Sequence, residues 1–133
     1  MKHDISDTIW EAAARGDIET LKDFLREGFD VNMRTGGDLT TPLVCAVEKG
    51  QIEAVRFLLD HGADVNLRDL YLWTPLMYAA AGNYIEIAEL LLRAGADVNM
   101  ETPNNPEKTP LAIAACKGHT RITQLLKNAG ATK

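Results

Sequence analysis

The sequence is poor in the residues on which metal and redox proteins depend. Two cysteines, Cys45 and Cys116, are too few for a disulfide framework and have no metal-ligand spacing. The three histidines, His3, His61 and His119, include no pair at a metal-binding spacing. We therefore expect no metal, no cofactor and a reducing, cytoplasmic setting.

Long apolar runs and basic clusters are missing as well. No stretch approaches the roughly 18 apolar residues that cross a bilayer, and the N-terminal segment lacks the apolar core of a secretory signal. Lys and Arg occur singly or in pairs, and the formal net charge is -5. This charge argues against nucleic acid and anionic membranes as partners, because both require a basic face. With 133 residues, 46% of them hydrophobic and 25% charged, the chain is expected to form a single domain over residues 1–133.

The sequence does contain an internal repeat. Residues 58–66 (LLDHGADVN) return 33 residues later as residues 91–99 (LLRAGADVN), and weaker copies occupy 24–32 and 126–131. A second marker, Thr-Pro-Leu, begins at Thr41, Thr74 and Thr109 in the same phase. Two independent markers with one period predict stacked supersecondary units, each of which depends on its neighbours for a core.

Each unit is predicted to hold two helices. Thr before Pro starts the first helix, because the hydroxyl caps free N–H groups and Pro has none to offer. Gly or Asn follows about two turns later and suits the left-handed residue that ends a helix. These helix-ending residues are Gly16, Gly50, Asn83 and Gly118. The second helix carries apolar residues at helical spacing, and the connection after it varies in length, which is typical of a surface loop.

This unit closely resembles the ankyrin repeat. The resemblance rests on Thr-Pro-Leu, the Ala-rich first helix and Gly-Ala-Asp-Val-Asn, and it covers about residues 7–131. It implies an all-α ankyrin-repeat solenoid of four stacked helix–turn–helix units with projecting hairpin-like loops. The expected units are about 7–38, 39–71, 72–106 and 107–133. The resemblance also implies a non-catalytic adaptor, inhibitor or effector that binds a partner protein through its concave face and loop tips.

The terminal units carry polar residues at positions that are apolar in the inner units. Asp7 and Thr8 stand where the inner units have Thr-Pro, and Asp23 stands at the position of Phe57. Lys127 replaces the final Leu of the second helix. Polar outer faces are typical of capping repeats, so we expect a complete four-repeat protein.

The second connection, residues 69–73 (DLYLW), is the main candidate for a partner site. It is apolar where the family pattern has polar residues and a Gly. Exposed apolar tips risk association, and aromatic side chains are favoured interface anchors. We expect Leu70, Tyr71 and Trp73 to form a binding hot spot and Leu72 to be buried, unless the rings pack on neighbouring tips or on Tyr78. Further candidates are Arg34, Arg68 and Met100 beside the hot spot and Tyr84 as an extension of the aromatic patch.

Three other features have structural interpretations. The Asp and Asn side chains of the recurring Asp-Val-Asn are expected to bond to nearby backbone and stabilise the turn. They are Asp30, Asp64, Asp97, Asn32, Asn66 and Asn99. Asn hydroxylation, which occurs in similar animal repeats, is a minor hypothesis for Asn66 and Asn99. Cys45 is expected to be buried and inert.

Two other functions stay open. The tip formed by residues 70–73 could join two copies of the chain in a structural module, although we expect a monomer in preference to a homodimer. An enzyme would need a polar pocket with perturbed titratable groups, and the sequence offers no such cluster.

Overall fold

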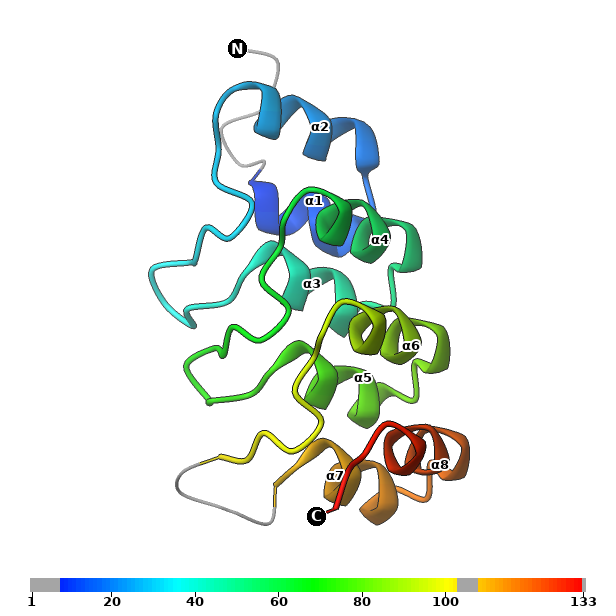
Figure 1. The fold of residues 1–133 in the computed structure, drawn as a ribbon. Coiled ribbons are helices and arrows are strands. Elements are labelled where there is room, and N and C mark those ends of the chain that lie inside the picture. Colours follow the sequence, from blue (N-terminus) through cyan, green and yellow to red (C-terminus); the bar gives the residue numbers. More distant parts are fainter. Residues whose placement is uncertain (1–7, 103–107, 133) are drawn as a thin grey trace.

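The computed structural model describes residues 8–102 and 108–132, which form eight helices in four pairs (Figure 1). The first helices of the pairs are α1 (Ile9–Arg15), α3 (Pro42–Glu48), α5 (Pro75–Gly82) and α7 (Pro110–Cys116). The second helices are α2 (Ile18–Arg26), α4 (Ile52–Asp60), α6 (Ile85–Arg93) and α8 (Thr120–Asn128). The predicted all-α repeat solenoid is confirmed.

The helices form two layers. Each first helix contacts the first helix of the next pair, and the second helices do the same. The first helices pack more closely together than the second helices do. The connections that follow α2 and α4 project from the same side of the stack, on the left in Figure 1. The tips of successive repeats therefore lie next to one another.

The local sequence determines where the first helices begin and end. The hydroxyls of Thr41, Thr74 and Thr109 accept hydrogen bonds from backbone N–H groups three residues on, at 3.3, 3.4 and 3.1 Å. At the other end of α5, Asn83 adopts a left-handed conformation with φ 61°. Both signals act within one turn of helix, which is why the sequence reveals them.

The first unit needs one correction. Its helix α1 is capped by Thr8, whose hydroxyl accepts a hydrogen bond from the N–H of Glu11 at 3.1 Å. Asp7, which the sequence placed at the capping position, lies outside the described residues. Since Gly16 still ends this helix, α1 starts one residue later in its repeat than α3 and α5 do.

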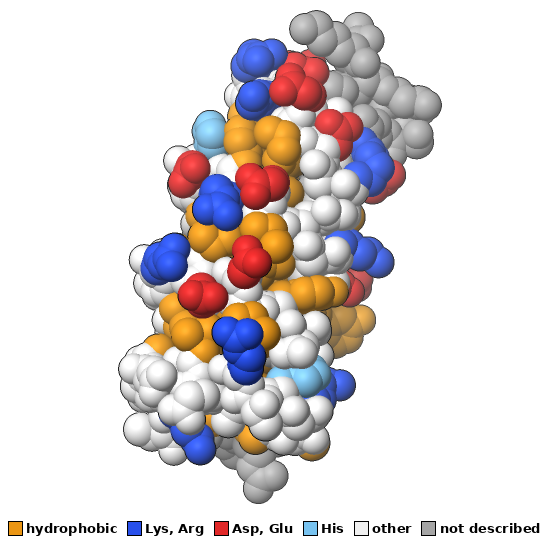
Figure 2. Space-filling view, turned by 90° about the vertical axis from the view of Figure 1, so that its right-hand side faces the viewer, with side chains coloured by type: hydrophobic (Ala, Val, Ile, Leu, Met, Phe, Trp, Pro, Cys, Tyr) orange, Lys and Arg blue, Asp and Glu red, His pale blue; other side chains and the backbone are white. Residues whose placement is uncertain are grey.

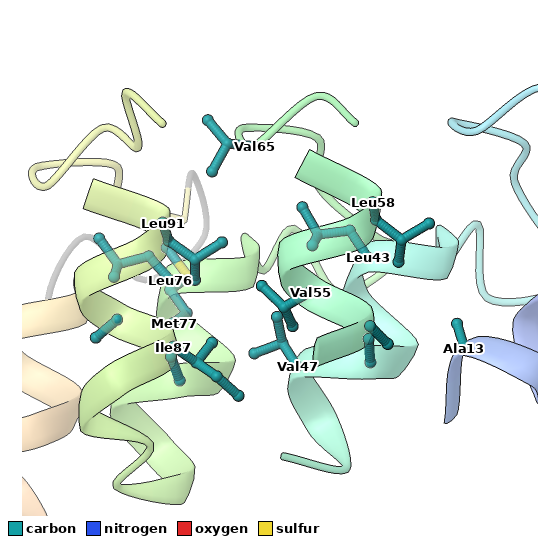
Figure 3. Packing of buried hydrophobic residues seen from close by; sticks show 14 of the residues in the cluster. Ala13, Leu43, Val47, Val55, Leu58, Val65, Leu76, Met77, Ile87 and Leu91 are labelled. Carbon is teal, nitrogen blue, oxygen red and sulfur yellow. The ribbon is translucent and has the colours of Figure 1, made fainter. Parts of the chain in front are cut away.

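The hydrophobic core runs along the stack between the two layers. Side chains from α3, α4, α5 and α6 point into one interior (Figure 3), and Leu43, Leu58, Leu76 and Leu91 are at most 1% exposed. The first helices contribute alanines with no exposed surface, which lets neighbouring helices approach closely. These alanines are Ala12, Ala13, Ala46, Ala79, Ala80 and Ala114.

The recurring Asn side chains connect each repeat to the next. The side-chain oxygen of Asn66 accepts a hydrogen bond from the N–H of Asp97 at 2.9 Å, and its amide donates to the C=O of Gly95 at 3.3 Å. Asn32 and Asn99 make the same pair of bonds to the repeat or turn that follows.

The local role predicted for the Asp side chains is confirmed, because the carboxylate of Asp64 accepts from the N–H of Asn66 at 3.0 Å. The Asn side chains also bond to backbone, as predicted, but their partners lie in the repeat or turn that follows and not in the same turn. Stacking brings the backbone of the next turn within reach of the Asn amide, a partner about one repeat away in sequence that a local pattern does not reveal.

We predict that Asn66→Ala lowers the free energy of unfolding by about 1–2 kcal/mol, because two hydrogen bonds between repeats are lost. Asn128→Ala is the matched control, since the side chain of Asn128 bonds to Gln124 within the same helix and, among the described residues, to no other repeat. Urea denaturation of the two variants measures the difference. Equal effects at the two positions would show that the Asn66 bonds do not hold the repeats together.

Candidate functional site

The second connection is organised around the carboxylate of Asp69, which is only 5% exposed. One oxygen accepts hydrogen bonds from the N–H groups of Tyr71 and Trp73, at 2.9 and 3.2 Å. The other accepts from the hydroxyl of Tyr78 on α5. A buried carboxylate is costly unless donors surround it, and this one has three. A single side chain therefore holds the loop in one shape and fixes it to α5, the first helix that follows the loop.

The phenol of Tyr78 is an unusually weak acid. Burial is the main cause that raises its pKa, and the hydrogen bond to Asp69 and the charge of that carboxylate add to the effect. Glu48 and Tyr71 raise the pKa further through their charges. Tyr78 consequently keeps its proton, and remains a hydrogen-bond donor to Asp69, across the neutral range.

The structure brings the predicted hot spot together only in part. Leu70 and Tyr71 project from the tip and are 53% and 63% exposed. Trp73 is half-buried, with its ring centroid 5.0 Å from that of Tyr78. The ammonium group of Lys108, at the same position in the next repeat, lies 5.7 Å from the Trp73 ring. Trp73 thus packs on Tyr78, the alternative that the sequence left open for the rings.

Between the first and second tips lies an open groove of about 430 Å³. Its lining includes Arg34, Leu39, Leu67, Arg68, Leu70 and Leu72. The N–H of Leu70 donates to the C=O of Asp38 at 2.7 Å, which joins the two tips. Leu72, which was expected to be buried, is half-buried along this groove.

Two leucines in this groove have a strained backbone. Leu39 and Leu72 hold equivalent positions in adjacent repeats and have φ values of 55° and 65°. A leucine in this left-handed region costs about 1 kcal/mol that a glycine would avoid. Both tips therefore carry a large side chain at a position where a glycine would be unstrained.

The predicted flanking residues differ in their surroundings. A terminal nitrogen of Arg68 lies against the sulfur of Met100 on the next connection. Arg34 is exposed, and among the described residues no carboxylate pairs with its guanidinium group. Both arginines line the groove, whereas Met100 reaches the site only through Arg68.

Tyr84 lies at the other end of α5, away from the tip. Its hydroxyl donates to the C=O of Glu48 at 3.3 Å, and its ring lies over Gly50 and Gly82. The residues at the same position in other repeats, Gln51 and His119, bond to the C=O groups of Ala14 and Ala80 at 3.0 and 2.8 Å. This position fastens each helix pair to the one before it, a role that the sequence analysis did not assign to Tyr84.

The two cysteines differ in their surroundings. Burial raises the pKa of the Cys45 thiol, which lies 3.9 Å from the Thr40 hydroxyl and is half-buried, less than expected. Cys116 is exposed at the end of α7, and both cysteines are free. Within residues 8–102 and 108–132, no three His, Cys, Asp or Glu side chains come together as a metal site. None of the described helices is long and apolar enough to cross a membrane.

Sequence reasoning missed three residues that shape this site: Asp69, Tyr78 as its partner, and Leu39. Asp at the start of a turn is a signal for side-chain bonding to the backbone two residues on. Asp69 provides that signal, but the sequence analysis considered only the apolar residues that follow it. Leu39 could have been found by aligning the first connection with the second, since it precedes Thr-Pro by the same distance as Leu72.

Comparison with known families matches most of the chain to ankyrin repeats. A model of ankyrin repeats, in three copies, matches residues 9–102, from the start of α1 into the connection after α6. A comparison with curated proteins finds no match.

We predict that the stabilising effect of Tyr78 depends on pH. Tyr78→Phe removes a donor to Asp69 and costs about 1–3 kcal/mol at neutral pH. The folded-state pKa lies above the ordinary value of 10.0. The contribution is therefore complete below about pH 10 and is lost as the pH rises further. The difference in unfolding free energy between wild type and Tyr78→Phe should stay constant at neutral pH and shrink as the pH rises above about 10. Denaturation at each pH measures this, and a constant difference would contradict it.

A second prediction concerns the ring of Tyr84. Gly50 and Gly118 have φ values of 70° and 74°, so alanine is strained equally at both. A Cβ atom at Gly50 would lie 2.8 Å from the Tyr84 ring, whereas one at Gly118 would meet nothing within 4 Å. Gly50→Ala should therefore destabilise the protein more than Gly118→Ala, and Tyr84→Ala should abolish the excess. Thermal denaturation compares the variants. Equal losses of stability for Gly50→Ala and Gly118→Ala would show that the Tyr84 ring does not lie over Gly50.

Proposed function

Because this chain belongs to the ankyrin-repeat family, we propose that it binds a partner protein through the tips of its connections and the adjoining side of its first helices. Ankyrin repeats are generally protein-interaction modules. The observation that carries the proposal is the second tip, where Leu70 and Tyr71 are exposed on a loop held by Asp69. The partner meets this tip as its central contact, and the chain acts in the cytoplasm as an adaptor, inhibitor or effector.

The tip has the properties of a preformed binding surface. Large apolar side chains gain most from burial against a partner, and aromatic residues dominate interface energetics. Fixing the loop before binding reduces the entropy lost on association. The bonds from Asp69 to two backbone N–H groups and to Tyr78 supply this rigidity.

The adjoining first-helix side extends the surface. Trp73, Tyr78 and Lys108 form an aromatic and cationic cluster beside the tip, and Glu48 and Lys49 are exposed further along α3. A contact that spans several repeats reaches the size of a typical specific interface, about 800 Å² per partner. Figure 2 views the side away from the connections, where apolar side chains lie in separate patches between charges of both signs. That side lacks the concentrated apolar tip.

The shifted titratable groups favour binding over catalysis. Hydrogen bonds from Thr20 lower the pKa of Asp17, burial raises that of Cys45, and burial with Asp69 raises that of Tyr78. These three groups belong to three different repeats, and each has a structural cause. Their arrangement supports a non-catalytic protein rather than an enzyme.

Self-association is a second candidate, favoured by one observation. Leu39, Leu70 and Tyr71 are 36%, 53% and 63% exposed on two neighbouring tips. Such a patch could join two copies of the chain.

We predict that Leu70→Ser/Tyr71→Ser reduces capture of a specific partner from a lysate of the source organism by about tenfold or more. Both side chains are exposed, so the double variant should fold normally, and circular dichroism checks this. The control is Phe29→Ala, which removes another exposed aromatic ring, 39% exposed, from the first repeat.

The possible results of the capture experiment distinguish partner binding from self-association. A partner lost only with the tip variant supports the proposed site. A partner retained by both variants places the binding surface elsewhere on the repeats. If wild type captures only itself, and light scattering shows a dimer that the tip variant disperses, self-association replaces partner binding.

A further inference from the structure

The groove between the first and second tips has a charge opposite to that of the whole chain. The formal net charge is -5, yet the groove is lined by two arginines, Arg34 and Arg68. Arg34 has no carboxylate partner among the described residues, and Arg68 lies against the thioether of Met100, which neutralises no charge. An Arg side chain without a carboxylate partner can form an ion pair with a carboxylate from another molecule.

The acids near the groove offset only part of this charge, since Asp69 with its single negative charge lies beside two arginines. The Asp69 oxygens accept hydrogen bonds from Tyr78, Tyr71 and Trp73, and among the described residues they form no ion pair with Arg34 or Arg68. The first tip contains one acid, Asp38, which is exposed and does not line the groove.

The apolar part of the groove includes two leucines whose backbone is strained. Leu39 and Leu72, from adjacent repeats, both adopt left-handed conformations that glycine would adopt without strain. Strained residues persist where the surrounding structure enforces them, and they concentrate at binding sites. Together with the exposed Leu70, they give the groove an aliphatic wall beside the two guanidinium groups.

We propose that this groove binds a segment of the partner protein in which an acidic side chain lies next to a large aliphatic one. The carboxylate pairs with Arg34 and Arg68, and the aliphatic side chain packs on Leu39, Leu70 and Leu72. This rests on the proposed function and adds the chemistry of the partner to it. The charge of the groove determines which segments bind, and the aliphatic wall supplies buried apolar area.

The test is selection of peptides from a displayed library of random dodecamers on the immobilised full chain. Wild type should enrich Asp or Glu within two residues of Leu, Ile or Met by at least about fivefold over the unselected library. Arg34→Gln/Arg68→Gln should abolish the enrichment of acids, and Arg34→Glu/Arg68→Glu should replace it with enrichment of Lys and Arg. Leu39→Gly/Leu72→Gly should abolish the enrichment of the aliphatic residue while keeping that of the acid.

A matched control uses two arginines on the second helices. Arg56 and Arg93 line a separate hollow of about 220 Å³ that also contains Glu86, Glu89 and Leu90. Arg56→Gln/Arg93→Gln should select the same peptides as wild type. This control tests whether the loss of any two positive charges is enough to abolish the enrichment of acids.

The best peptide then gives a quantitative check by titration calorimetry. Changing its acid to the amide should weaken binding to wild type about tenfold and binding to Arg34→Gln/Arg68→Gln less than about twofold.

Three results would overturn the proposal. Peptides selected without an acid, or with an acid that does not depend on Arg34 and Arg68, would exclude this chemistry while leaving the proposed function intact. Failure to select any peptide above library background would also reject it, and lysate capture would then decide the proposed function separately. A dimer in light scattering that Arg34→Gln/Arg68→Gln disperses would assign the groove to a second copy of the chain.

Discussion

A pair of helices of seven to nine residues is too small to bury its apolar face alone, so every pair in this chain depends on the next. This constraint explains the buried alanines of the first helices, the leucines between the layers and the Asn side chains that bond from one turn to the following one. The position after each first helix serves the same end, because Gln51, Tyr84 and His119 all bond back to the preceding pair. The tips of the connections lie outside the two helix layers, and in the inner repeats it is there that the sequence departs most from the repeating pattern.

The candidate site lies at two of these tips, and it forms because stacking brings the first and second tips side by side. Its groove has one wall from the first tip and one from the second, and the N–H of Leu70 joins the two through Asp38. Asp69 holds the second tip against Tyr78, so that Leu70 and Tyr71 remain exposed while Trp73 packs inward. One repeat alone would present neither the paired arginines nor the paired leucines. The candidate surface thus depends on neighbouring units, in the same way as the core.

The sequence predicted the features that depend on near neighbours. Thr41 and Asn83 mark helix ends because capping involves residues within one turn, and the period of the repeat predicted the stack. Features that depend on other repeats were missed or misjudged. The partners of Asn66 lie 29 and 31 residues away, and the Tyr84 hydroxyl reaches a carbonyl 36 residues away. The tip was identified from its unusual composition, but its division into exposed and packed side chains required the bonds of Asp69 and the position of Tyr78.

Site-specific photo-crosslinking tests the central claim, that a partner docks on the second tip, most directly. A photoreactive phenylalanine analogue would replace Tyr71 in one full-length protein and Arg56, exposed on α4 of the second-helix layer, in another. Both would be irradiated in a lysate of the source organism, and the adducts would be identified by mass spectrometry. The account predicts that position 71 forms a covalent adduct with one partner protein and that position 56 does not. An adduct at position 56 with none at position 71 would contradict it.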